Sequence, residues 1–213
     1  MLRETPFYAE SGGQISDVGE IIGEGWRLDV DDVRRIDGRV AALGKLTGAF
    51  KFGRVTARVP SDRRRDTERN HTATHLLHAA LRNVLGQHVF QRGSNITRER
   101  LRFDFSHPTA MTKEQIAAVE QLVQEWIDAG VPVEREVMTQ EEAHRHGAIG
   151  LFDERYSGPV SVYRIGDKSL EFCGGPHVHN TSELGQFSIV KEQSVGAGLR
   201  RIRAVLTPAT ATT

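Results

Sequence analysis

Cysteine is nearly absent from this sequence, which has only Cys173 among 213 residues. A single cysteine excludes a disulfide within the chain, so a reducing, cytoplasmic location is expected. No apolar run approaches the roughly 20 residues that a membrane-spanning helix needs, and the first residues lack the apolar stretch of a signal peptide. The 28 basic residues equal the 28 acidic ones in number. Overall charge therefore does not favour nucleic-acid binding, and any RNA contact must be a local patch.

Residue patterns predict an α+β chain in two parts. Residues 1–60 alternate between apolar and polar residues in short runs separated by glycine turns, which predicts a small β-barrel-like domain. The expected strands are 18–22, 26–36, 40–46 and 54–59, and Asp37-Gly38 predicts a hairpin turn between the second and the third. Pro60 and the charged residues that follow it mark the boundary.

Residues 61–206 are expected to form a mixed α/β domain. Apolar residues spaced three and four apart predict helices at 66–85 and 112–130. Capping-box patterns that begin at Thr112 and Thr139 predict the start of the second helix and a further short helix at 139–146. Alternating runs predict strands at 101–105, 133–138, 160–165, 186–191 and 199–206. Residues 207–213 are small and polar and are expected to be a disordered tail.

Two separated clusters carry the pattern of a metal site. His71 and His75 are four residues apart on a predicted helix, so they share one face. Cys173 and His177 flank a Gly-Gly turn that allows the backbone to bring both side chains to one ion. Three imidazoles and a thiolate suit Zn²⁺. Buried histidines or a buried cysteine explain either pair alone, whereas the two pairs together favour a metal.

The spacing also limits the chemistry. The helix lacks the glutamate of His-Glu-x-x-His, so the base of a metalloprotease is missing. Four protein ligands form a closed shell, which is typical of structural zinc. The residue spacing is therefore compatible with either a catalytic or a structural zinc site.

Five segments resemble the editing domain of alanyl-tRNA synthetases and the free-standing AlaX-type proteins. In chain order they are Thr5–Gln14, Asn70–Leu81, Arg102–His107, Cys173–Val178 and Gly196–Ile202. The resemblance covers residues 5–206 and implies zinc-dependent hydrolysis of Ser-tRNA(Ala) and Gly-tRNA(Ala). The chain would then be either an editing fragment, acting with the rest of the synthetase, or an AlaX-like protein.

The resemblance also assigns residues. It places the zinc ligands at His71, His75, Cys173 and His177, and the glutamine of the editing pocket at Gln91. The family usually has threonine where this chain has Pro176, which removes a hydroxyl and a backbone donor beside the metal.

Further candidates follow from the chemistry of this substrate. A site that rejects alanine must hydrogen-bond the hydroxyl of serine. The candidates for this contact are Ser11, Thr72, Thr74 and the zinc itself, and the two threonines are equally explained as helix-surface residues. Gln91 is expected to orient water or to bind the ester carbonyl by hydrogen bonds. Candidates for contact with the tRNA acceptor end are Gly12, Gly13, Gln14, Arg63, Arg64, Arg65, Arg69 and Arg200. The glycines are also explained by a tight turn and the arginines by a solvated charge run. The alternative function is a tRNA-binding module with a structural zinc and no activity.

Overall fold

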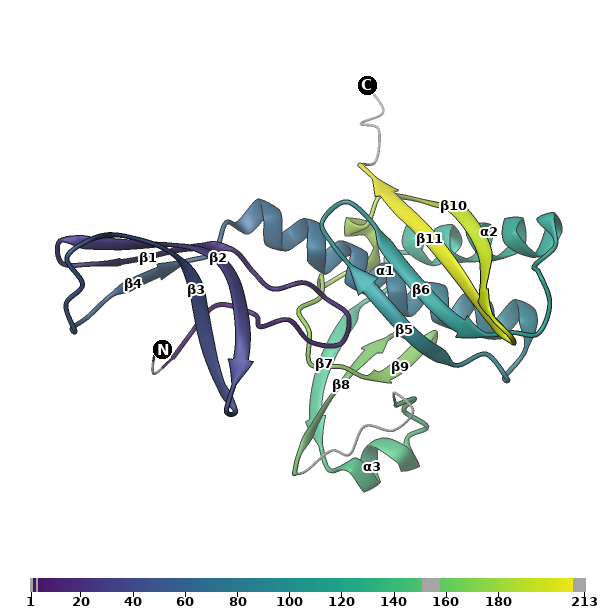
Figure 1. Ribbon diagram of the computed structural model, residues 1–213. Helices are drawn as coiled ribbons and strands as arrows, with labels where there is room; N and C mark the ends of the chain where they lie inside the picture. The colour runs from purple at the N-terminus through teal and green to yellow at the C-terminus, as the bar shows by residue number, and fades with distance from the viewer. Residues whose placement is uncertain (1, 3, 151–157, 209–213) are drawn as a thin grey trace.

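Three antiparallel sheets and a long central helix make up the computed structural model, which describes residues 2, 4–150 and 158–208 (Figure 1). The predicted mixture of helices and strands is confirmed. In the described part of the chain, no helix is both long and apolar enough to span a membrane.

The first sheet has the strand order β3-β2-β1-β4 and contains the predicted N-terminal strands. Their bounds are β1 (Gly19–Gly23), β2 (Trp26–Ile36), β3 (Arg39–Gly48) and β4 (Thr56–Arg58). A two-residue turn joins β2 to β3, and Asp37 and Gly38 in that turn both have positive φ. The barrel-like closure expected from the sequence is not confirmed, because β3 and β4 are the two edge strands of the described sheet. With only three residues, β4 is too short to close it.

The central helix α1 (Ser61–Leu85) begins at Ser61, not at Asp66 as predicted. Its first turns carry charges with no apolar periodicity, and their partners lie elsewhere in the chain. Arg64 pairs with Asp17, and Arg65 pairs with Glu183. Further along, most of the helix is buried, so α1 lies in the middle of the molecule.

The second sheet has the order β10-β11-β6-β5 and packs with α1 and α2 around the largest apolar core. The bounds are β5 (Gln91–Ile96), β6 (Leu101–Ser106), α2 (Lys113–Asp128), β10 (Gln186–Gly196) and β11 (Leu199–Thr207). The predicted capping box of α2 is confirmed, because Thr112 and Gln115 bond each other's backbone amides. Strand β5 was not predicted. Thr207 ends β11 rather than starting a tail, and residues 209–213 of the expected tail lie outside the described residues.

The third sheet, in the order β7-β8-β9, leads directly to the cysteine. Its elements are β7 (Val133–Met138), β8 (Val160–Ile165) and β9 (Ser169–Phe172), with α3 (Gln140–Arg145) between β7 and β8 and the short helix η1 (Thr181–Glu183) after β9. Because β9 ends at Phe172 and lies against α1, Cys173 emerges beside the buried face of that helix.

A loop at the start of the chain, residues 7–17, reaches from the first sheet to β5. The amide of Ile96 donates to the carbonyl of Gly13 (2.7 Å), and the amide of Ile15 donates to the carbonyl of Ile96 (3.1 Å). We call residues 7–17 the N-terminal loop. It brings side chains from the first part of the chain to the face of α1.

Candidate metal centre

Four side chains from two distant segments meet at one point. The Sγ atom of Cys173 lies 3.4 Å from Nε2 of His71 and 3.3 Å from Nε2 of His177. His71 and His75 lie one turn apart on α1, with their rings stacked at 5.4 Å. All four potential ligand atoms lie within 4.8 Å of one another. The structure therefore brings together the four residues that the sequence selects, as a group that could hold a metal ion.

Each imidazole of the group is held through its other ring nitrogen. Nδ1 of His71 donates to Oε1 of Gln14 at 2.6 Å. Nδ1 of His75 lies 2.9 Å from a carboxylate oxygen of Glu171, and Nδ1 of His177 donates to Oγ1 of Thr72 at 3.0 Å. These contacts leave Nε2 of each ring free to bind a metal, which is the usual arrangement of metal-binding histidines.

The donor atoms also fit a metal chemically. Nε2 of His75 is buried and has no hydrogen-bond partner among the described residues. Burial and the neighbouring His71 lower the pKa of His177 to about 3, so its ring is neutral. Burial opposes ionisation of Cys173, but His71 and His177 hold the pKa of this thiol well below its usual value. A thiolate and a neutral imidazole are the forms that bind metals.

The turn after Cys173 depends on Gly175. A Cβ atom on Gly175 would lie 2.3 Å from Cε1 of His71, so a side chain would displace that ring. The amide of Gly175 also faces Sγ of Cys173, at 3.5 Å. The proline at position 176, where the resembled family usually has threonine, leaves this donor in place. The amide that faces the sulfur belongs to Gly175, the residue before the proline.

Glu171 is a site residue that the sequence reading missed. Its buried carboxylate lies between Nδ1 of His75 and Nδ1 of His78, and it also accepts from Ser169. Burial favours its neutral form, but the two imidazoles keep its pKa well below the usual value. In turn, burial disfavours a charged His75, yet Glu171 raises the pKa of that ring to about 10. Glu171 precedes Cys173 by two residues and so shares its strand face, a signal that was available in the sequence.

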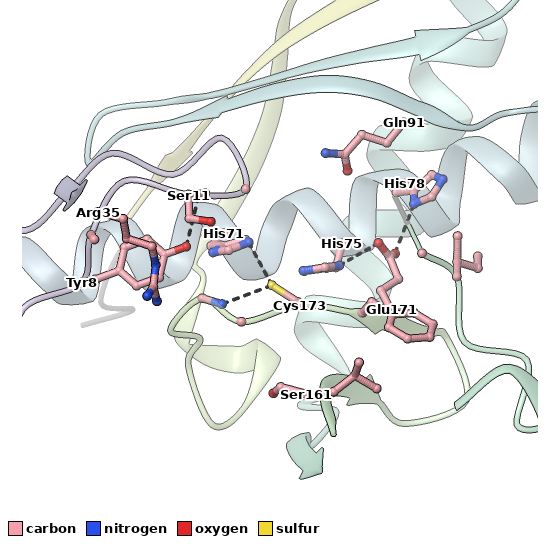
Figure 2. Close-up of a pocket in the computed structure, with 18 of the residues that line it drawn as sticks. Tyr8, Ser11, Arg35, His71, His75, His78, Gln91, Ser161, Glu171 and Cys173 are labelled. Carbon is pink, nitrogen blue, oxygen red and sulfur yellow. Dashed lines mark hydrogen bonds and ion pairs between the residues drawn. The ribbon is translucent and has the colours of Figure 1, made fainter. Parts of the chain in front are cut away.

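Three of the four members of the group, His71, His75 and Cys173, line a cavity of about 380 Å³, and His177 is not among its described lining residues. Figure 2 shows its labelled lining residues, with the Cys173 sulfur between His71 and His75. Tyr8, Ser11 and Arg35 come from the first part of the chain, and Gln91 comes from β5. The cavity therefore lies between the N-terminal loop, α1 and the strand that leads to the cysteine.

Two of the four predicted pocket residues line this cavity. Gln91 and Ser11 both do, and the Gln91 amide donates to Oγ of Ser94 at 3.2 Å. Thr72 and Thr74 are not among the described lining residues. Their hydroxyls are buried and donate to backbone carbonyls one turn back on α1. The structure therefore does not bring these two threonines to the cavity.

The residues predicted to contact tRNA lie in different environments: some line the cavity, some are buried and some are on the surface. Gly12 lines the cavity, Gly13 packs against Ser94, and Gln14 is buried against His71. Most of the arginines already have partners in the protein, as the following contacts show. Arg64 binds Asp17, Arg65 binds Glu183, Arg69 binds the carbonyl of Leu184, and Arg200 binds Glu192. Arg63 is exposed near the start of α1.

This chain is similar in sequence to parts of known tRNA synthetases. Residues 160–203 match the family described as threonyl and alanyl tRNA synthetase second additional domain, and residues 1–63 match class II (A) tRNA synthetases. An alanine–tRNA ligase of Lachnoclostridium phytofermentans is 49% identical over 96% of this chain, which is 24% of that relative. Alanine–tRNA ligases of Leptospira biflexa and Haemophilus influenzae are 46% and 47% identical, again over 96% of this chain, which is 22% and 24% of those relatives. The chain thus spans about a quarter of the length of these relatives, and it belongs to the alanyl-tRNA synthetase family.

Proposed function

We propose that this chain removes serine or glycine wrongly attached to tRNA(Ala), by hydrolysing the ester that joins the amino acid to the terminal ribose. The observation that carries this proposal is that three members of the metal-binding group, His71, His75 and Cys173, line a cavity that Gln91 also lines. A purely structural metal site needs no adjoining cavity. The similarity to alanine–tRNA ligases supports tRNA(Ala) as the carrier of the ester.

Zinc is the metal we propose for the group. Three imidazole nitrogens and one thiolate form the borderline-soft, four-atom set that zinc prefers. When bound, zinc would polarise the ester carbonyl or orient the substrate beside Gln91.

Gln91 would position the reacting groups. Its amide has two donors and an acceptor and does not ionise near neutral pH, so it orients water or the ester by hydrogen bonds rather than taking a proton. The contact with Ser94 limits the conformations of the Gln91 side chain. Such fixed placement suits an ester that already hydrolyses readily.

Selection of serine over alanine would depend on polar groups that alanine leaves unpaired. We assign this contact to Ser11 and Gln91, because both line the cavity. The hydroxyls of Thr72 and Thr74 are already bonded within α1. Thr72 instead fixes the ring of His177, which gives it a role in building the site.

A second candidate function is a tRNA-binding module with a structural zinc. The closed set of four protein ligands favours it, because structural zinc sites have this pattern. The two candidates predict different results in the same assay.

The deciding experiment measures deacylation of Ser-tRNA(Ala) and Gly-tRNA(Ala), with Ala-tRNA(Ala) as the control. We expect loss of serine and glycine and slow loss of alanine, and we expect chelation of the metal to stop the reaction. The Cys173→Ala variant should lose zinc and activity together. Tight binding of Ser-tRNA(Ala) without zinc-dependent serine release would instead support the binding module.

A further inference from the structure

The guanidinium of Arg35 lies at the cavity and has no role in the proposed function. Arg35 lies near the end of β2, in the first sheet, and its side chain lines the cavity beside Tyr8 and Ser11. Among the described lining residues, it is the only lysine or arginine. Arg35 is exposed, and its guanidinium has no hydrogen-bond or ion-pair partner in the described part of the chain.

The neighbouring arginine, Arg34, is also exposed but differs in its position and in having an ion-pair partner. Side chains alternate along a strand, so Arg34 and Arg35 point to opposite faces of the sheet. Arg34 pairs with Asp32 at 2.5 Å and is not among the described residues that line the cavity. The sequence therefore provides two adjacent arginines on one strand, of which one is paired and the other is unpaired at the cavity.

Arg35 and Gln91 lie at opposite ends of the cavity. Figure 2 shows Arg35 with Tyr8 on one side of the Cys173 sulfur and Gln91 on the other. A substrate whose ester lies near Cys173 and Gln91 would extend the rest of the molecule toward Arg35. In an aminoacylated RNA, the amino acid has no free carboxylate, so the nearest anion on that side is a backbone phosphate.

We propose that Arg35 binds the phosphate of the terminal nucleotide of the aminoacylated RNA and thereby sets substrate affinity. This inference rests on the proposed function. A guanidinium presents paired donors that match two phosphate oxygens, which an ammonium group does not. Because the contact is remote from the ester, it contributes equally to binding before and during the reaction, and so it acts on KM rather than on kcat.

The test compares two small substrates, seryl-adenosine esterified on the ribose and the same ester carrying a 5′-phosphate. With the wild-type chain, we expect the phosphate to lower KM. Arg35→Ala should raise KM for the phosphorylated ester about five- to tenfold, with kcat nearly unchanged. It should leave hydrolysis of the phosphate-free ester unaltered. Arg34→Ala is the matched control and should retain the wild-type preference.

Two further measurements test whether the effect comes from the guanidinium rather than from a change in folding or metal content. Arg35→Lys should restore part of the lost affinity, since it keeps the charge but not the paired donors. Zinc content and melting temperature should be the same in all three variants, because both side chains are exposed. Equal KM values for wild-type and Arg35→Ala chains on the phosphorylated ester would overturn the proposal.

Binding of uncharged RNA separates this proposal from the proposed function. The affinity of an acceptor-stem minihelix ending in CCA should fall in Arg35→Ala, and its dependence on log salt should weaken by about one unit of slope. If the wild type releases no serine but this binding effect appears, the hydrolase proposal fails and the role of Arg35 stands. If serine is released and minihelix binding does not change in Arg35→Ala, the role of Arg35 fails alone.

Discussion

Oε1 of Gln14 accepts a hydrogen bond from Nδ1 of His71 at 2.6 Å, across 57 residues of sequence. Gln14 is 1% exposed, so it is placed to hold the ring rather than to meet RNA at the surface. The backbone bonds between the N-terminal loop and Ile96 hold it there. The N-terminal loop therefore supplies the contact that orients a metal ligand on α1.

Gln14→Ala should weaken zinc binding about 10- to 100-fold, because the ring of His71 loses its orienting partner. Competition with a chelator of known zinc affinity measures this loss. Gln14→Glu keeps the acceptor and should bind zinc more tightly than Gln14→Ala. Gln121→Ala, on the exposed face of α2, is the control and should match the wild type. Wild-type zinc affinity in Gln14→Ala would show that His71 needs no such partner.

Gly175→Ala should disrupt the metal group, whereas Gly174→Ala should not. The added methyl group would overlap the His71 ring in the first case and meet nothing within 4 Å in the second. We expect Gly175→Ala to lower zinc content in purified protein and to lower the free energy of unfolding by about 1–3 kcal/mol, as overpacked buried sites do. Elemental analysis and denaturant titration check the pair. Identical zinc content in both variants would contradict the geometry of this turn.

Glu171→Gln should weaken both the fold and the metal site. A neutral amide accepts from only one of the two rings, His75 and His78, so the other Nδ1 loses its acceptor. An unsatisfied buried donor costs about 1–3 kcal/mol. We therefore expect a lower free energy of unfolding without zinc, and weaker zinc binding. The exposed Glu141 on α3 provides the control, Glu141→Gln, which should change neither quantity.

Gln91→Ala should spare the metal and impair hydrolysis. Gln91 lines the cavity, and its side chain donates a hydrogen bond to Ser94 rather than to one of the four ligand residues, so zinc content should equal that of the wild type. Loss of one positioned hydrogen-bonding group typically slows a reaction about 100-fold. Serine release from Ser-tRNA(Ala) measures the effect, with Gln87→Ala in the exposed turn before β5 as the control. Undiminished serine release would remove Gln91 from the proposed mechanism.

Local patterns in the sequence were enough to predict most elements and the four ligand candidates. His71 and His75 follow directly from helical periodicity, and the Asp37-Gly38 turn follows from the backbone conformations that these residues tolerate. The capping box of α2 is likewise a short-range pattern. Each of these features depends on residues a few positions apart, and this is the range over which a single sequence is informative.

The remaining features depend on contacts between distant segments. Strand β5 has a polar, glycine-containing sequence without alternation, and it forms because β6 pairs with it. The early start of α1 depends on Asp17 and Glu183, which bind arginines of its first turns. The role of Gln14 likewise depends on docking of the N-terminal loop, which no local pattern reveals.

The docking of the N-terminal loop on β5 has a consequence for how the chain can be divided. Strand β5 is an outer strand of its sheet, and the bridge between Gln14 and Ile96 covers part of its exposed backbone. Cutting at the predicted boundary, Pro60, would uncover that backbone, leave His71 without its partner and remove Ser11 from the cavity. A shortened protein starting at the helix would thus be both poorly soluble and chemically incomplete, although it would retain all four metal-binding side chains.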